Sequence, residues 1–322
     1  MKGRAEHRAK SETQMRKALA GRPNFIVGFY NELYLSKEYT TAQAYTRIIL
    51  RYYSSCASST VEDFNYENIS QFFLSLHGKN SDECSDSAYA TNRAALYSFG
   101  EYLLKQKLIT ENPVGRTSPR KVKDYTCKDY LLTEELHDLL VQIKNNSLGS
   151  EREQARRKPW IERNLAIISL MVATGIRVTA LSELNISDYN GSELVVLDKG
   201  RKQFEYELDE MTCRILNDWI NKRKDILKEK ECEALFISNR LTRITTKSLR
   251  DLVKSYTEHL GKNISPHRLR SSYAIKLYKE TGDIFLVQQC LKHSDIRTTI
   301  RYMSDFSIGN KEAAKIATRG LY

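Results

Sequence analysis

The 322-residue sequence lacks the features that mark membrane, secreted and zinc-binding proteins. No apolar run approaches the roughly 20 residues that a helix needs to cross a bilayer. Residues 1–4, Met-Lys-Gly-Arg, lead into further charge rather than into the apolar core of a secretory signal. The six cysteines are scattered without a C-x-x-C pair, so a zinc site has no support. We therefore expect a cytoplasmic protein with free thiols and no membrane association.

Positive charge, by contrast, is in excess. The chain carries 51 Lys and Arg against 40 Asp and Glu, a formal net charge of +11. Such a balance indicates a polyanionic partner, either nucleic acid or an anionic membrane. Because the chain shows no membrane segment, nucleic acid is the more economical partner. The length allows two domains, each with its own core.

The N-terminal part begins with a basic segment and continues with helical patterns. Residues 1–22 carry seven Lys or Arg against two Glu and are interpreted as a basic arm, with a solvated, poorly ordered terminus as the competing interpretation. Within 23–112, apolar residues recur at helical spacing four times, in residues 25–33, 45–53, 69–76 and 94–104. Four short helices are enough for a small bundle.

Residues 113–128 break this pattern and indicate an exposed linker between domains. Pro113 and Pro119 flank Gly115. Four basic residues lie nearby and are expected either to be solvated or to follow a phosphate backbone: Arg116, Arg120, Lys121 and Lys123.

Residues 129–322 mix helical and strand patterns, so the predicted fold class is mainly α with a small β-sheet. Two strands, 194–197 and 204–208, enclose a turn at 198–202, and 234–237 is a candidate third strand. The predicted helices are one following Thr133 as its cap, one within 160–173 that ends at Gly175, one over 246–260, one from Pro266 to about Glu280, and one capped by Asp283 and running to Leu291.

Two residues of this half suit phosphodiester chemistry. Phosphodiester transfer requires a nucleophile, cations on the non-bridging oxygens and an acid for the leaving oxygen. His267 and Arg270 are three residues apart in the helix that begins at Pro266, so both project from one face near its N-terminus. The arginine fork can donate to two phosphate oxygens. Arg268 lies about 100° around the helix and is the weaker candidate.

Each fragment alone has an ordinary explanation: an H-x-x-R pair is usually a surface pair, and a lone tyrosine is usually packing. The order of the fragments is more specific. Ala-Thr-Gly-Ile-Arg at 173–177, Lys-Gly-Arg-Lys at 199–202, Pro-His-Arg-Leu-Arg at 266–270 and the segment from Leu291 to Tyr302 follow one another along the chain. In this order they resemble the active-site boxes of the tyrosine recombinase (phage integrase) family. The resemblance covers roughly residues 24–310.

The resemblance implies a role for each matching residue. Tyr302 would attack the scissile phosphate and form a 3′-phosphotyrosyl link, while Arg177 and Arg270 would hold the phosphate. His267 would assist proton transfer with the tyrosine, and His293 would donate a hydrogen bond to a phosphate oxygen. The ordinary pKa of a tyrosine is about 10, so this nucleophile needs a base or cationic surroundings.

Lys199 would protonate the leaving 5′ oxygen, with Lys202 in the same turn as the alternative acid. Arg201 and Lys202 are also expected to contact DNA. The covalent link conserves the bond energy, so neither a cofactor nor a metal is expected. The chain departs from the family pattern at Ala180, where an acidic residue is frequent, and at Lys292, where glycine is common. These departures favour an enzyme of a mobile element.

The resemblance further implies a helical, SAM-like core-binding domain at 23–112 and a mixed α+β catalytic domain at 129–322, with a docking segment at 308–322. The implied partners are double-stranded DNA and three further copies of the chain, in a tetramer on two DNA sites. Accessory DNA-bending or directionality proteins are further candidates. Two other classes stay open: a type IB topoisomerase-like or telomere-resolving enzyme, and a non-catalytic DNA-binding regulator on the same fold.

Overall fold

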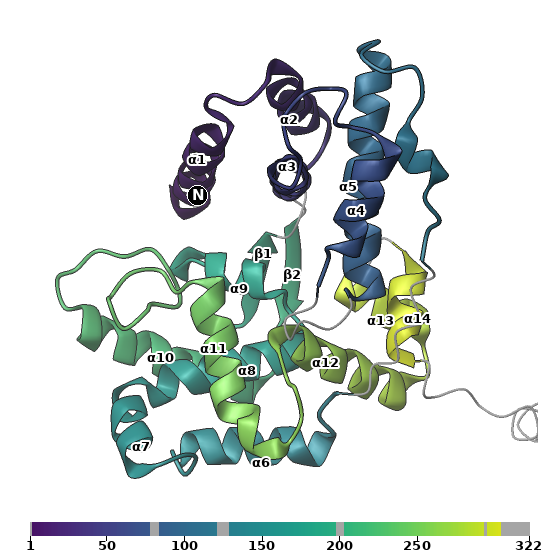
Figure 1. Ribbon diagram of the computed structural model, residues 1–322. Coiled ribbons are helices and arrows are strands. Elements are labelled where there is room, and N and C mark those ends of the chain that lie inside the picture. Colours follow the sequence, from purple (N-terminus) through teal and green to yellow (C-terminus); the bar gives the residue numbers. More distant parts are fainter. Residues whose placement is uncertain (1, 78–83, 121–128, 198–202, 293–294, 304–322) are drawn as a thin grey trace, which may run out of the picture. The chain divides into compact units, whose positions relative to one another are not determined.

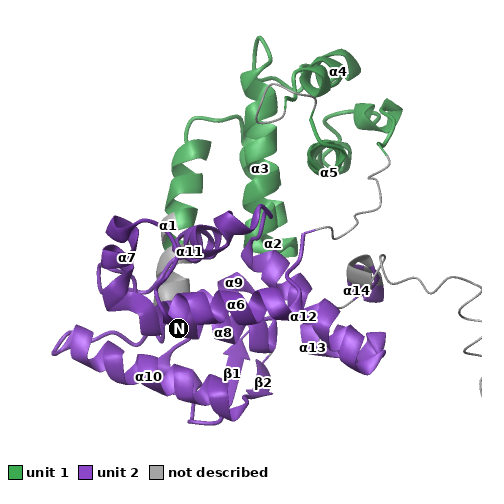
Figure 2. Cartoon of the chain, turned by 90° about the horizontal axis from the view of Figure 1, so that it is seen from below, with its two compact units in different colours: residues 1–124 green, residues 125–322 purple. Residues whose placement is uncertain are grey.

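The computed structural model describes residues 2–77, 84–120, 129–197, 203–292 and 295–303 (Figure 1). Over these ranges the chain is mainly helical and contains a single two-stranded antiparallel sheet, so the predicted fold class is confirmed. The chain divides into two compact units, residues 1–124 and 125–322 (Figure 2). None of the described helices has both the length and the apolar character that crossing a membrane requires.

Unit 1 contains the four helices that the apolar spacing predicts. They are α2 (Asn24–Ser36), α3 (Tyr39–Ser54), α4 (Tyr66–Leu74) and α5 (Asp86–Lys105), followed by the 3-10 helix η1 (Pro113–Arg116). Asn65 caps α4 and Ser85 caps α5, each side chain accepting a hydrogen bond from a backbone N–H of the first turn. Aromatic rings fill the core: Phe29 meets Phe99 edge to face with ring centroids 5.0 Å apart.

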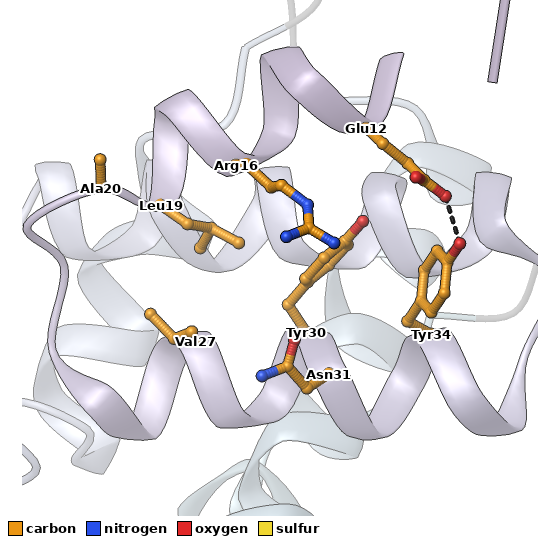
Figure 3. A pocket seen from close by; sticks show the side chains of 8 residues that line it. All are labelled: Glu12, Arg16, Leu19, Ala20, Val27, Tyr30, Asn31 and Tyr34. Carbon is orange, nitrogen blue, oxygen red and sulfur yellow. Dashed lines mark hydrogen bonds between the residues drawn. The ribbon is translucent and has the colours of Figure 1, made fainter. Parts of the chain in front are cut away.

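Most of the basic segment at the start of the chain is helix α1 (Lys2–Leu19). Met15 and Leu19 are four residues apart on one helix face and are buried in the core of unit 1. Tyr34 of α2 donates a hydrogen bond to Glu12, and Leu19 lies across from Val27 (Figure 3). Two apolar side chains and the hydrogen bonds of Glu12 and Ser11 therefore dock this charged helix on unit 1.

Unit 2 is built around a buried central helix, α8 (Ile161–Thr174), which packs against α6, α10 and α12. The other elements are α6 (Thr133–Lys144), α7 (Glu151–Arg157), η2 (Lys158–Trp160), α9 (Val178–Glu183), η3 (Ile186–Asp188), β1 (Glu193–Leu197), β2 (Gln203–Glu207), α10 (Glu210–Leu227), α11 (Thr246–Thr257), η5 (Glu258–Leu260), α12 (Pro266–Thr281), α13 (Ile284–Leu291) and α14 (Ile296–Met303).

The predicted strand pair is confirmed, with Val196 opposite Phe204 and Leu194 opposite Tyr206. The predicted third strand at 234–237 is wrong, because these residues make only isolated bridges. Side chains of α10 take carbonyls of this segment: Trp219 Nε1 donates to the Leu235 oxygen at 2.9 Å, and Arg223 Nε donates to the Ala234 oxygen at 2.9 Å. The segment is fully buried, and its backbone is satisfied by these side chains, by Arg163 of α8 and by the backbone of Leu184 and Ile244 instead of by a sheet.

Helix caps are placed largely as the sequence predicts. Gly175 ends α8 in the left-handed conformation (φ 59°), and Asp283 caps α13 by accepting from two backbone N–H groups. Thr133 is the exception, because it is the first helical residue of α6 and Leu132 occupies the cap position. The Glu135 side chain accepts the Leu132 N–H at 2.8 Å, and this bond stabilises the start of the helix without a polar cap residue.

Candidate active site

Arg177 stands at the sharp junction between α8 and α9. The left-handed Gly175 stops α8, and Arg177 then takes an extended conformation as the cap residue of α9. Its guanidinium Nη2 donates to the backbone oxygen of Lys292, 3.4 Å away at the end of α13. This bond joins the end of α8 to the end of α13, although Arg177 and Lys292 are 115 positions apart in the chain.

Arg270 joins three helices. It projects from the first turns of α12, where Pro266 is the first residue and Ser265 caps the helix. Only 4% of the residue is exposed. Its guanidinium donates to the backbone oxygens of Gly175, which closes α8, and of Leu291, which closes α13. These two charge-assisted bonds fix the plane of the guanidinium.

His267 is exposed at the start of α12, and the groups around its ring nevertheless shift its pKa. Loss of hydration lowers the pKa of His267, and the charges of Arg270, Arg268 and Arg177 lower it further. The neutral imidazole is therefore favoured near pH 7, the form that can accept a proton. The Nη2 of Arg268 lies 4.0 Å from Asp129.

Tyr206 of β2 belongs to the same neighbourhood, although sequence reasoning did not single it out. Burial raises the pKa of its hydroxyl, while the charges of Arg270 and Arg177 act to lower it. The structure therefore brings Arg177, His267 and Arg270 together and adds Tyr206 within the electrostatic reach of the two arginines. The only signal in the sequence is the alternation of Phe204 and Tyr206 along the strand.

Several predicted site residues lie outside the described residues: Lys121, Lys123, Lys199, Arg201, Lys202 and His293. For Tyr302 the structure describes the backbone, which belongs to α14, and α14 packs against α12 and α13. The predicted nucleophile thus comes from a helix that contacts the helix of His267 and Arg270. Its place in the site stays a prediction.

The two described linker arginines belong to unit 1. Arg116 pairs with Glu111, and both side chains are exposed. Arg120 lies over the Tyr89 ring, 4.5 Å from its centroid, and donates to the Cys84 oxygen. Their contact with DNA stays a prediction. Among the residues that the structure describes, no group of three or more His, Cys, Asp and Glu is placed to hold a metal ion.

Replacing Gly175 by Ala should destabilise the protein more than replacing Gly282 by Ala. Both glycines close a helix in the left-handed conformation, with φ values of 59° and 65°. Strain of this kind costs about 1 kcal/mol for an alanine. A Cβ at Gly175 would also lie 2.5 Å from the Tyr273 ring, whereas one at Gly282 meets nothing within 4 Å. We expect ~1–3 kcal/mol of additional loss from this overpacking. Equal losses in urea unfolding would contradict the packing described at Gly175.

Acid should destabilise the wild-type protein more than the His267→Gln variant. The pKa of His267 is lower in the folded chain than its ordinary value of about 6.5, so the unfolded chain binds the proton more readily. The contribution of this histidine is complete above about pH 6.5 and is lost as the pH falls. Melting temperatures between about pH 7.5 and 5.5 should therefore fall less steeply for the variant. Parallel curves would show that His267 titrates alike in both states.

Comparison with known proteins agrees with this geometry. The model of the phage integrase family matches residues 130–307, more than half of the chain. The chain belongs to this family. It is 35% identical over 221 residues to the tyrosine recombinase XerC of Caldanaerobacter subterraneus, a match that covers 67% of this chain and 58% of that protein. It is 31% identical over 224 residues to the XerD of Oceanobacillus iheyensis, covering 68% of this chain and 71% of that protein.

The fold is also that of a solved relative. The XerH site-specific recombinase bound to its difH substrate, in a pre-cleavage complex, matches with a TM-score of 0.65 and 21% identity. The match covers 88% of this chain and 80% of that chain. The family match includes Arg177, His267, Arg270 and Tyr302, so the resemblance that these residues carry in the sequence is confirmed at the level of the family.

Proposed function

We propose that this phage integrase family member is a site-specific DNA recombinase that cleaves and rejoins DNA through a 3′-phosphotyrosyl intermediate. One observation carries the proposal. Arg177 and Arg270 come from distant segments and meet at the two carbonyls that end α13, while α14, which contains Tyr302, packs on α12 and α13. Two arginines beside a tyrosine-bearing helix are what a phosphotyrosine reaction requires.

In the proposed reaction the Tyr302 hydroxyl oxygen bonds to the scissile phosphorus as the bond from phosphorus to the 5′ oxygen breaks. The leaving 5′ oxygen takes a proton from Lys199 or from Lys202, which stays the alternative. Rejoining reverses these steps with a 5′ hydroxyl of the partner strand. Each step exchanges one phosphodiester for another, so it consumes no high-energy cofactor.

The described residues support the division of roles. Arg177 and Arg270 supply fixed positive charge where the phosphate develops its negative charge. Such charge also lowers the cost of ionising a tyrosine. His267, held neutral by its surroundings, is suited to accept the Tyr302 proton and to return it on rejoining. His293 is proposed to donate to a phosphate oxygen.

The assembly is part of the same proposal. Double-stranded DNA is the substrate, and four copies of the chain would act on two duplexes in the cytoplasm. Residues 308–322, outside the described residues, are proposed to dock on a neighbouring copy. Arg116, Arg120, Lys121, Lys123, Arg201 and Lys202 are proposed DNA contacts, and their charge fits a phosphate backbone. The chain's departures at Ala180 and Lys292 favour a mobile element as its source.

The test of this function is strand exchange between two sites. DNA bound by the protein in its native genome supplies the target, and two copies of it are placed on one supercoiled plasmid. The proposal predicts excision or inversion of the segment between the sites. Relaxation of the plasmid without exchange would instead support the topoisomerase-like alternative. Binding without any covalent adduct on nicked DNA would support the regulator.

A further inference from the structure

Lys292 has a backbone conformation that a lysine rarely adopts. It follows α13 with φ 54° and ψ 45°, in the left-handed region, and its N–H donates to the Gln289 oxygen at 3.0 Å. Glycine takes this conformation without strain, and a side chain with a Cβ does not. A strained residue beside a candidate active site suggests that its side chain has a function.

The Lys292 ammonium lies over two aromatic rings of β2. Its Nζ is 4.8 Å from the centroid of the Phe204 ring and 5.9 Å from that of the Tyr206 ring. These rings are two residues apart, so they share one face of the strand, the same face as the buried Leu194 and Val196 on β1. A cation over the faces of aromatic rings is attracted by their quadrupoles. The contact therefore ties the end of α13 to the hairpin.

The backbone of the same residue contacts the arginines. The Lys292 oxygen accepts from Arg177, and the preceding oxygen, that of Leu291, accepts from Arg270. Tyr206, one of the two rings under the ammonium, lies within the electrostatic reach of both arginines. Lys292 thus touches the hairpin with its side chain and a phosphate-binding arginine with its carbonyl.

We propose that Lys292 is a positioning residue. Its ammonium, in contact with the Phe204 and Tyr206 rings, fixes the position of β2 relative to Arg177. The inference rests on the proposed function and adds a residue to it. β2 begins at Gln203, and the candidate acids Lys199 and Lys202 precede it directly in the chain, so the placement of β2 limits how far from the arginines either lysine can lie. Lys292 would therefore act through the hairpin rather than on the phosphate.

The test measures single-turnover adduct formation at saturating protein on two DNA substrates. One has the natural 5′ bridging oxygen, and the other has a 5′ bridging sulfur, a leaving group that needs no acid. We expect Lys292→Met to slow the oxygen substrate about tenfold and the sulfur substrate no more than about twofold, since a cation–π contact of ordinary strength is lost. Lys292→Arg, which keeps a cation for the rings, should recover most of the rate.

Two further variants make the test specific. Phe204→Leu removes one ring, and combining it with Lys292→Met should slow the oxygen substrate no more than the slower single change, because both remove one contact. Lys224→Met removes a charge from an exposed position of α10 and should leave both rates unchanged. Melting temperatures identify a variant that fails to fold. In that case Lys292→Arg and Phe204→Leu decide the question.

Four results would overturn the inference: an unchanged rate for Lys292→Met, equal slowing on both substrates, additive effects in the double variant, or a fall in DNA affinity with a weaker salt dependence. The last result would make Lys292 a direct phosphate ligand. If the wild-type protein forms no adduct on either substrate, the proposed function itself fails. The reaction of the wild-type protein therefore separates a failure of the proposed function from a failure of this inference.

Discussion

Replacing Tyr302 by Phe should reduce covalent adduct formation by at least ~10⁴-fold, because removal of a nucleophile eliminates the chemical step rather than slowing it. The affinity for DNA should change by no more than a few-fold, since binding depends on many phosphate contacts. Adduct formation is measured by denaturing gel on nicked DNA that traps the cleaved state, and affinity by titration of intact DNA at one stated salt concentration.

Two other tyrosines provide the matched controls. Tyr273 and Tyr278 lie on α12, the helix of His267 and Arg270, and the ring of Tyr273 faces Gly175. Tyr278→Phe and Tyr273→Phe should both retain the adduct, although Tyr273→Phe can lower stability by removing a half-buried hydroxyl. Persistence of the adduct in the Tyr302 variant, and its loss in either control, would move the nucleophile to α12.

Replacing Arg270 by Lys should lower the cleavage rate by ~10²–10³-fold even though the charge is kept. A lysine cannot reproduce the planar fork that donates to the Gly175 and Leu291 oxygens and that, in the proposed function, also binds the phosphate. Arg268→Lys is the control on the same helix, and we expect its rate to stay within about threefold because its guanidinium is directed to Asp129.

Rates for the two arginine variants are compared at a temperature at which circular dichroism shows both to be folded. This condition matters because Arg270 is buried, and its replacement leaves two carbonyl oxygens without their charged donor. Equal rates for the two variants, or a larger loss for Arg268→Lys, would show that the phosphate is held by a different residue of α12.

Local signals in the sequence are sufficient to predict an element whose turn or cap depends only on neighbouring residues. The hairpin, the glycine stop at Gly175 and the helix beginning at Pro266 each depend on a few neighbouring residues, and the structure has all three. The helix α10 had signals of the same kind, with Asp209 as its cap and Leu216 and Trp219 buried, but it was not among the predicted elements. The local pattern of α10 is therefore sufficient to predict this helix.

Other features were beyond sequence reasoning because they depend on distant contacts. The segment 234–237 has a strand-like composition, but two of its carbonyls accept from Trp219 and Arg223 of α10 and a third from Arg163 of α8. The sequence of α1 is rich in residues that favour a helix, but the burial of Met15 and Leu19 depends on contacts with the rest of unit 1. Neither outcome follows from the local pattern of residues.

The same distinction applies to the site. The order of the motifs in the sequence predicts that Arg177, His267 and Arg270 belong to one site. The structure places them around the ends of α8 and α13. The sequence marked Lys292 as unusual but gave no indication that its ammonium lies on Phe204 and Tyr206. That contact requires the left-handed turn after α13 and the hairpin to meet, which is a property of the tertiary structure.

The most direct measurement of the central claim is the chemical identity of the residue joined to DNA. The adduct trapped on nicked DNA is digested with nuclease and trypsin, and the peptides are sequenced by mass spectrometry. We expect a nucleotide 3′-phosphate on Tyr302, in the peptide that spans residues 302–311. The same modification on Tyr273 in the peptide 271–276, on Tyr278 in the peptide 277–279, or on a serine would contradict it.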